Sequence, residues 1–250
     1  MHPPLLFLGA LFLLLLTAPA ASAAKAPQIL MIGDSLSVGP FGATLQEKLI
    51  DRFGGANVSI YASCGSSPEH WLLTEPVFVT RCGYREKTAK TSFVREYENG
   101  RRPMATGTPK VERLIGKHGA QIVIVQLGTN WMDDFAPRIT EEEVKKKAAI
   151  LARMGGALRG RKVFWILPPD TTKFSRAVES TVRSLILRAA RTYRFGIIDS
   201  SDMTHYVVGR TGSDGVHYGG ADARSWASQV MVQLARNVPA VSSPRIHINQ

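Results

Sequence analysis

The sequence predicts a single α/β domain in which helices cover both faces of a five-stranded parallel sheet. Five short apolar runs are predicted to be strands, at residues 28–33, 57–62, 121–127, 162–167 and 195–199. Their apolar character is continuous rather than alternating, which is typical of strands buried on both faces. Amphipathic segments follow the runs, so strand and helix alternate along the chain, as in a three-layer α/β/α domain.

The amphipathic segments predict five helices, near residues 42–52, 109–118, 140–158, 175–193 and 220–236. Residues 72–108 interrupt the alternation, because they combine turn residues and clustered cations with little periodicity. Long irregular segments in compact domains are commonly functional. We therefore expect an irregular insertion here that faces the substrate.

The N-terminal residues 1–24 are predicted to be a secretory signal. Residues 5–16 are almost wholly apolar, and small residues follow them up to Ala24. The apolar run is too short to span a bilayer comfortably, but only His2 precedes it, so an uncleaved anchor remains the alternative. Cleavage would leave about 225 residues, which we interpret as one domain at 25–238 and a flexible tail at 239–250. The expected location is secreted or periplasmic.

The chain carries a formal net charge of +11 at pH 7 and has a sequence pI near 10.0. Outside the cytoplasm, such a charge favours anionic envelope surfaces as partners, rather than nucleic acid. An excess of Lys and Arg that serves solubility alone is the alternative interpretation.

Cys64 and Cys82 are the only cysteines. An even pair in an exported chain predicts a disulfide, and closing so short a loop contributes about 3 kcal/mol. A reactive thiol is the alternative, although neither cysteine lies in a Cys-x-x-Cys or zinc-ligand spacing. Because no metal-binding or nucleotide-binding motif occurs either, we expect no metal and no cofactor.

Polar residues follow three of the apolar runs at the point where each strand would end. Gly-Asp-Ser-Leu occupies residues 33–36, Cys-Gly-Ser residues 64–66 and Gly-Thr-Asn residues 128–130. A fourth block, Asp-Gly-Val-His at residues 214–217, precedes the last amphipathic segment. A serine between a strand and a helix is well placed as a nucleophile, since the first turn of the helix offers unpaired N–H groups to an oxyanion.

These four blocks, in this order, resemble those of the SGNH (GDSL) hydrolase family over roughly residues 28–235. The resemblance implies the flavodoxin-like strand order 2-1-3-4-5. It also implies that Ser35 is the nucleophile, His217 the base and Asp214 the carboxylate that orients the base. Ser37 offers a second hydroxyl, so the choice of Ser35 depends on the alignment with the family's Gly-Asp-Ser.

The resemblance further implies an oxyanion hole formed by the backbone N–H groups of Ser35 and Gly65 and by the side-chain amide of Asn130. Taken singly, Gly65 is equally interpreted as a turn glycine and Asn130 as a helix N-cap. The chain departs from the family at Trp131, where many members have aspartate.

Three further residues are substrate-binding candidates. Asp34 precedes the nucleophile, but adjacent side chains of a strand point to opposite faces, so a local turn role competes with substrate contact. Trp131 could shape the pocket or pack in the core, and Tyr84 could stack on a sugar or pack in the core. Asp133 and Asp134 are interpreted as the solvated start of a helix.

The sequence therefore predicts an exported serine esterase that removes acyl groups, O-acetyl above all, from a glycan or another envelope polymer. The expected partner is the acylated glycan or another ester, with no membrane span after signal cleavage. Lipase, lysophospholipase or thioesterase activity remains open within the family. A glycan-binding scaffold without turnover and an acyltransferase are the further alternatives.

Overall fold

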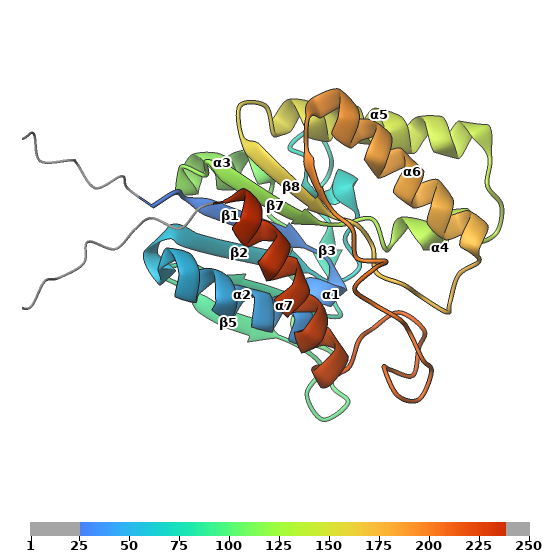
Figure 1. Ribbon diagram of the computed structural model, residues 1–250, viewed down its shortest axis with the longest axis horizontal. Helices are drawn as coiled ribbons and strands as arrows, with labels where there is room; N and C mark the ends of the chain where they lie inside the picture. The colour runs from blue at the N-terminus through green and yellow to red at the C-terminus, as the bar shows by residue number, and fades with distance from the viewer. Residues whose placement is uncertain (1–25, 239–250) are drawn as a thin grey trace, which may run out of the picture.

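A computed structural model describes residues 26–238 (Figure 1). The predicted signal at 1–24 and the predicted tail at 239–250 lie outside the described residues. The central feature is a seven-stranded sheet whose order is β5-β4-β2-β1-β7-β8-β9. A second, two-stranded sheet pairs β3 with β6.

The five predicted strands form the parallel part of the large sheet. They are β1 (Ile29–Gly33), β2 (Val58–Ser63), β7 (Ile122–Gln126), β8 (Lys162–Ile166) and β9 (Gly196–Ile198). Numbered along the chain, these five follow the order 2-1-3-4-5. The predicted fold class and strand order are therefore confirmed.

Helices cover both faces of the sheet, and the apolar side chains of β1 explain why. Ile29 and Met31 belong to one core cluster, with residues of α2 (Pro40–Phe53) and α7 (Gly220–Asn237). Leu30 and Ile32 belong to the other, whose helices are α3 (Val111–His118), α5 (Glu141–Ala157) and α6 (Arg176–Tyr193). Successive side chains of β1 thus point into the cores on opposite faces of the sheet, which is why the run is apolar throughout.

The two longest helices of the second face begin at side-chain caps. The Thr140 hydroxyl accepts from the N–H of Glu143 at the start of α5, and the Ser175 hydroxyl accepts from the N–H of Val178 at the start of α6. Such caps satisfy N–H groups that have no partner inside the helix. Shorter elements complete the chain: α1 (Ser35–Val38), η1 (Gly55–Asn57), η2 (Pro68–Trp71) and α4 (Trp131–Phe135).

The insertion at 72–108 is more regular than predicted. It contains β3 (Val79–Thr80), β4 (Tyr84–Lys87), β5 (Ser92–Arg95) and β6 (Thr106–Gly107). β4 pairs antiparallel with β2, and β5 forms the outer edge of the sheet beside β4. The prediction of an irregular segment was wrong because β5 exposes three successive side chains, and an edge strand of this kind has no apolar alternation to reveal it.

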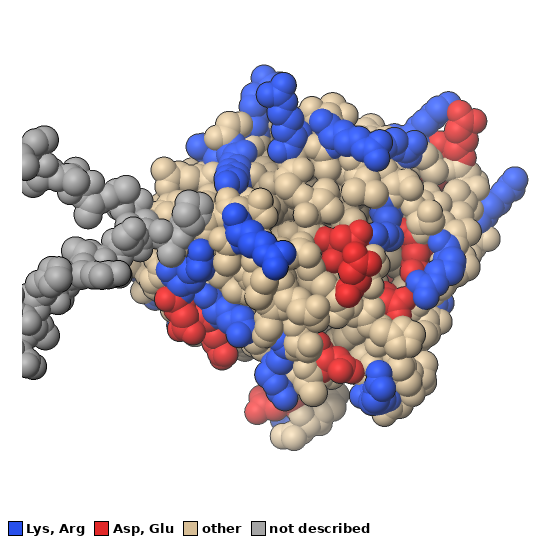
Figure 2. Space-filling view, viewed as in Figure 1, with Lys and Arg blue, Asp and Glu red and all other residues tan. Residues whose placement is uncertain are grey.

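The predicted disulfide between Cys64 and Cys82 is present. It joins the residue after β2 to the turn before β4, so the hairpin is tied to the carboxyl end of a central strand. Lys and Arg outnumber Asp and Glu on the face shown in Figure 2, in line with the net charge of +11. No helix within residues 26–238 is both long enough and apolar enough to cross a membrane.

Candidate active site

Ser35 lies where β1 gives way to α1, as the first residue of that short helix. Asp34 is the N-cap, and its Oδ1 accepts a hydrogen bond from Leu36 N at 3.0 Å. The turn is tight, because a Cβ on Gly33 would collide with the side chain of Ser37. Ser37 itself is fully buried and donates to Gln126 Oε1 at 2.7 Å. Of the two hydroxyls in the motif, only that of Ser35 faces the pocket.

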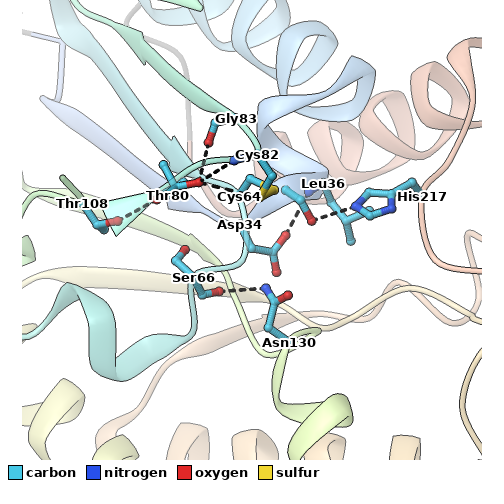
Figure 3. The surroundings of a disulfide bond; sticks show 12 residues. Asp34, Leu36, Cys64, Ser66, Thr80, Cys82, Gly83, Thr108, Asn130 and His217 are labelled. Atoms are coloured by element: carbon cyan, nitrogen blue, oxygen red, sulfur yellow. Dashed lines mark hydrogen bonds between the residues drawn. A yellow bond between two sulfur atoms is a disulfide. The ribbon is translucent and has the colours of Figure 1, made fainter. Parts of the chain in front are cut away.

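Three predicted residues form one hydrogen-bonded chain at this edge of the sheet. Ser35 Oγ lies 2.9 Å from His217 Nε2, and His217 Nδ1 lies 2.5 Å from Asp214 Oδ2. Figure 3 shows His217 reaching towards the amino end of α1 from the segment before α7. The second carboxylate oxygen, Asp214 Oδ1, accepts from the N–H groups of Val216 and His217 at 2.9 and 2.8 Å. These bonds hold the carboxylate beside the imidazole.

The charge of Asp214 is set by these contacts. Burial raises its pKa, but the hydrogen bonds from the His217 backbone, the His217 ring and the Val216 backbone together outweigh burial. The net effect holds the pKa of Asp214 well below its usual range, so the side chain is ionised at neutral pH. An ionised carboxylate can stabilise a positive charge on the ring of His217.

The two other residues predicted to donate to an oxyanion, Gly65 and Asn130, line the same pocket as Ser35. Gly65, two residues after β2, has φ +78°, a conformation that strongly favours glycine. Asn130 follows β7, and its Nδ2 donates to the carbonyl of Ser66 at 2.9 Å (Figure 3). This bond uses one of the two amide hydrogens and places the side chain next to the Gly65 turn. The second hydrogen remains for a ligand.

The five residues predicted for catalysis line one pocket of about 290 Å³. The disulfide forms part of its wall, since both Cys64 and Cys82 line the pocket. Sequence reasoning gave the remaining lining residues no role in the site: Thr129, Asp133, Lys173, Phe174 and Val216.

Lys173 and Asp133 are an ion pair at the rim, with Lys173 Nζ 2.7 Å from Asp133 Oδ1. Asp133 thus has a partner at the pocket rather than only a solvated helix start. Lys173 comes from the segment between β8 and α6, where no motif marks it. Its place after a parallel strand is the one signal that could have pointed to the site.

The three substrate-binding candidates lie in the interior. Trp131 is fully buried and donates its Nε1 hydrogen to Glu69 at 2.8 Å. Tyr84 is buried among core residues, and its hydroxyl contacts Glu86 at 3.4 Å. Both rings therefore pack in the core, and neither is placed to make the substrate contact that the sequence left open.

Asp34 is also fully buried, so its role is that of a helix cap rather than a substrate contact. Burial raises the pKa of Asp34 to about 7, against the opposing hydrogen bond from Leu36 N. Among the described residues, Oδ2 of Asp34 has no hydrogen-bond partner. With a pKa of about 7, the carboxyl of Asp34 is only partly ionised near neutral pH.

Comparison with known proteins agrees with this architecture. No protein-family model matches the sequence, and no curated protein matches it either. A peptidoglycan O-acetylesterase structure matches with a TM-score of 0.51 at 14% identity, over 86% of this chain and 92% of that chain. Est24, a carbohydrate acetylesterase from Sinorhizobium meliloti, matches with a TM-score of 0.51 at 15% identity, over 84% of this chain and 99% of the other.

A putative GDSL-like lipase from Parabacteroides merdae ATCC 43184 matches with a TM-score of 0.52 at 12% identity, over 86% of this chain and 98% of that one. At such identities the likeness is one of fold. The chain therefore has the fold of the SGNH (GDSL) esterases, as the four motif blocks predicted.

Proposed function

We propose that this chain is an exported serine esterase that hydrolyses small acyl esters, acetyl esters above all, on a glycan or another envelope polymer. The observation that carries the proposal is the hydrogen-bonded chain from Ser35 through His217 to Asp214. Its distances of 2.9 and 2.5 Å are those that proton transfer and orientation of the base require.

In the first half of the reaction, Ser35 Oγ attacks the ester carbonyl while His217 Nε2 takes the hydroxyl proton. The carbonyl oxygen becomes an oxyanion, which accepts hydrogen bonds from the N–H groups of Ser35 and Gly65 and from Asn130 Nδ2. His217 then gives its proton to the leaving alcohol oxygen, and the ester bond breaks. The acyl group remains on Ser35.

In the second half, a water molecule replaces the alcohol. His217 takes a proton from this water, whose oxygen attacks the acyl carbonyl, and the same donors hold the second oxyanion. The bond to Ser35 Oγ breaks as His217 returns the proton to it, and the free acid leaves. Asp214 stays ionised throughout and stabilises the transient imidazolium.

The pocket supports a small acyl group. A volume of about 290 Å³ lies at the small end of ligand pockets and must also admit part of the alcohol. Its rim carries the Lys173 and Asp133 charges, which suit a hydroxyl-rich alcohol better than a second alkyl chain. Two of the structures with this fold are named for acetyl removal from peptidoglycan and from carbohydrate.

The disulfide supports export, since bonds of this kind persist in oxidising compartments. The predicted signal at residues 1–24 supplies the route. Both observations agree with a substrate in the cell envelope or outside the cell.

The test compares acetate released from O-acetylated envelope glycans with fatty acid released from long-chain esters by the same preparation. We expect acetate release, loss of that release in Ser35→Ala, and labelling of Ser35 by a serine-directed phosphonate. Faster release of long-chain acids would assign the protein to the lipases instead. Glycan binding without labelling would indicate a scaffold, and acyl transfer to an added alcohol in preference to water would indicate a transferase.

A further inference from the structure

Among the described residues, Lys and Arg side chains without a carboxylate partner are concentrated at the edge of the sheet opposite Ser35. All five parallel strands begin there, so the segments that precede β2, β7, β8 and β9 lie along it. The β4–β5 turn lies there too, because Lys87 at the end of β4 pairs with Ile60 near the start of β2. The end of α7 joins them, since Lys162 Nζ donates to the carbonyl of Asn237.

These segments contain nine cations and one carboxylate, that of Asp51. We call the nine together the basic edge: Arg52, Lys90, Lys117, Arg159, Arg161, Lys162, Arg191, Arg194 and Arg236. Figure 2 shows mostly Lys and Arg around the end of α7. With the one carboxylate of Asp51, these segments carry a net charge of +8, against +11 for the whole chain.

The edge of the sheet that carries Ser35, here called the catalytic edge, differs from the basic edge in the number of carboxylates that accompany its cations. Within residues 26–238, none of the nine cations forms a salt bridge to a carboxylate. At the catalytic edge carboxylates lie among the cations, and several form ion pairs: Lys147 with Glu69, Asp134 and Glu143, Lys173 with Asp133, and Arg176 with Asp170 and Glu179. The basic edge has nine cations and a single carboxylate, and such an excess of positive charge favours an external anionic partner.

The nine cations form a row along one edge of the sheet. They extend from the turn beside β4 to the start of β9, a row six strands wide, or roughly 24 Å at the usual strand spacing. No large apolar side chain in these segments is exposed, so the contact would be electrostatic and reversible by salt.

The position of Ala26 adds an independent observation. This first described residue precedes β1 at the basic edge, and the apolar run at 5–16 ends about ten residues earlier. A segment of that length spans at most roughly 35 Å. The predicted leader therefore joins the described chain at the basic edge and not at the edge that carries Ser35.

We propose that the basic edge docks on an anionic lipid bilayer and holds the catalytic pocket on the side that faces away from it. Each basic side chain at an anionic bilayer surface strengthens association roughly fivefold. The proposal does not depend on the esterase activity, because Ser35 lies at the other edge.

The test measures partitioning of the protein, purified as its exporting host processes it, onto vesicles of phosphatidylcholine alone or mixed with phosphatidylglycerol. The edge variant replaces four exposed arginines by glutamine: Arg159, Arg161, Arg191 and Arg236. The control variant removes the same charge at the catalytic edge: Arg101, Arg102, Arg138 and Arg210 to glutamine. None of these eight side chains makes a hydrogen bond or ion pair to another described residue, so both variants should fold, which thermal unfolding checks.

We expect the wild type to bind the phosphatidylglycerol vesicles and to be released by salt. The edge variant should lose roughly several hundredfold in partitioning, and the control variant far less. Equal losses in the two variants, or equal binding to both kinds of vesicle, would overturn the proposal. So would an edge-dependent loss of binding to a soluble anionic polysaccharide without any loss on vesicles, because it would assign the edge to a polymer. Absence of ester hydrolysis would leave this result unaffected.

Discussion

Ser35 Oγ and His217 Nε2 lie 2.9 Å apart although 182 residues separate them in the sequence. The packing of the two helices that follow them helps to hold this distance. Phe41 at the start of α2 stacks on Trp226 in α7, with ring centroids 3.6 Å apart. Ser35 and His217 are therefore each within ten residues of one shared aromatic contact in the core.

The first prediction separates the two serines of the motif. Ser35→Ala should lower kcat/KM for an acetyl ester by roughly 10⁴-fold or more with unchanged thermal unfolding, because it removes the attacking oxygen. Ser37→Ala is the matched control. It leaves Gln126 Oε1 buried without its donor, so we expect a loss of about 1–3 kcal/mol in the free energy of unfolding and retained turnover per folded molecule. Undiminished turnover in a folded Ser35→Ala protein would contradict the assignment.

The second prediction concerns the oxyanion donor. Asn130→Asp keeps the size of the side chain and removes its N–H groups. We expect kcat to fall roughly 10²–10³-fold while KM changes little, because the donor acts on charge that develops in the transition state. Steady-state kinetics on a soluble acetyl ester measure both constants. A folded variant with unchanged kcat would show that Asn130 only holds the Ser66 carbonyl.

The third prediction concerns the disulfide at the pocket wall. Replacing Cys64 and Cys82 by serine should lower the free energy of unfolding by about 3 kcal/mol, since the unfolded chain regains the freedom of the open loop. Turnover should also fall, because the Gly65 turn loses its anchor. Denaturant unfolding and kinetics report the two effects. Two titratable thiols in the native protein would contradict the prediction.

The fourth prediction concerns pH. The pKa of Asp34 is raised to about 7 in the folded chain, above the ordinary value near 3.8 that it regains on unfolding. Between these two values the folded state binds more protons than the unfolded state, so the free energy of unfolding falls as pH rises. Above pH 7 both states are ionised and the cost of burying the charge is complete.

Asp34→Asn keeps the cap acceptor and removes the titration. Its stability relative to the wild type should therefore increase from about pH 4 to 7 by up to about 4 kcal/mol and then stay level. Urea unfolding of both proteins over this range measures the difference. Parallel pH profiles for the two would show that Asp34 does not titrate there.

The sequence predicted the parallel sheet well because buried strands leave a strong pattern. Both faces of β1 and β7 are covered, so nearly every position is apolar. The predicted amphipathic segments match α2, α3, α5, α6 and α7 within a few residues. The edge hairpin left no such pattern. Ladder hydrogen bonds hold β4 against β2 and β5 against β4, and these bonds depend on the main chain more than on side-chain type.

The residues of the candidate site also differ in how well the sequence could predict them. Ser35, Asp214 and His217 could be found because chemistry restricts which residues can do their work, and the structure brings them together. Trp131 was harder to place, since a tryptophan beside a site residue serves packing and binding alike, and only its burial decides. Lys173 was not predicted, because no motif marks it and its contact with Asp133 depends on where two separate loops meet.

The first and last described residues, 26 and 238, lie close together at one edge of the sheet. The carbonyl of Gln28 accepts from Gln121 N, whose carbonyl accepts from Lys162 N, and the Lys162 side chain reaches the carbonyl of Asn237. A short peptide could therefore connect residues 26 and 238 without approaching Ser35. We therefore expect a circular permutant with new termini in the turn at residues 88–91 to fold and to retain its activity.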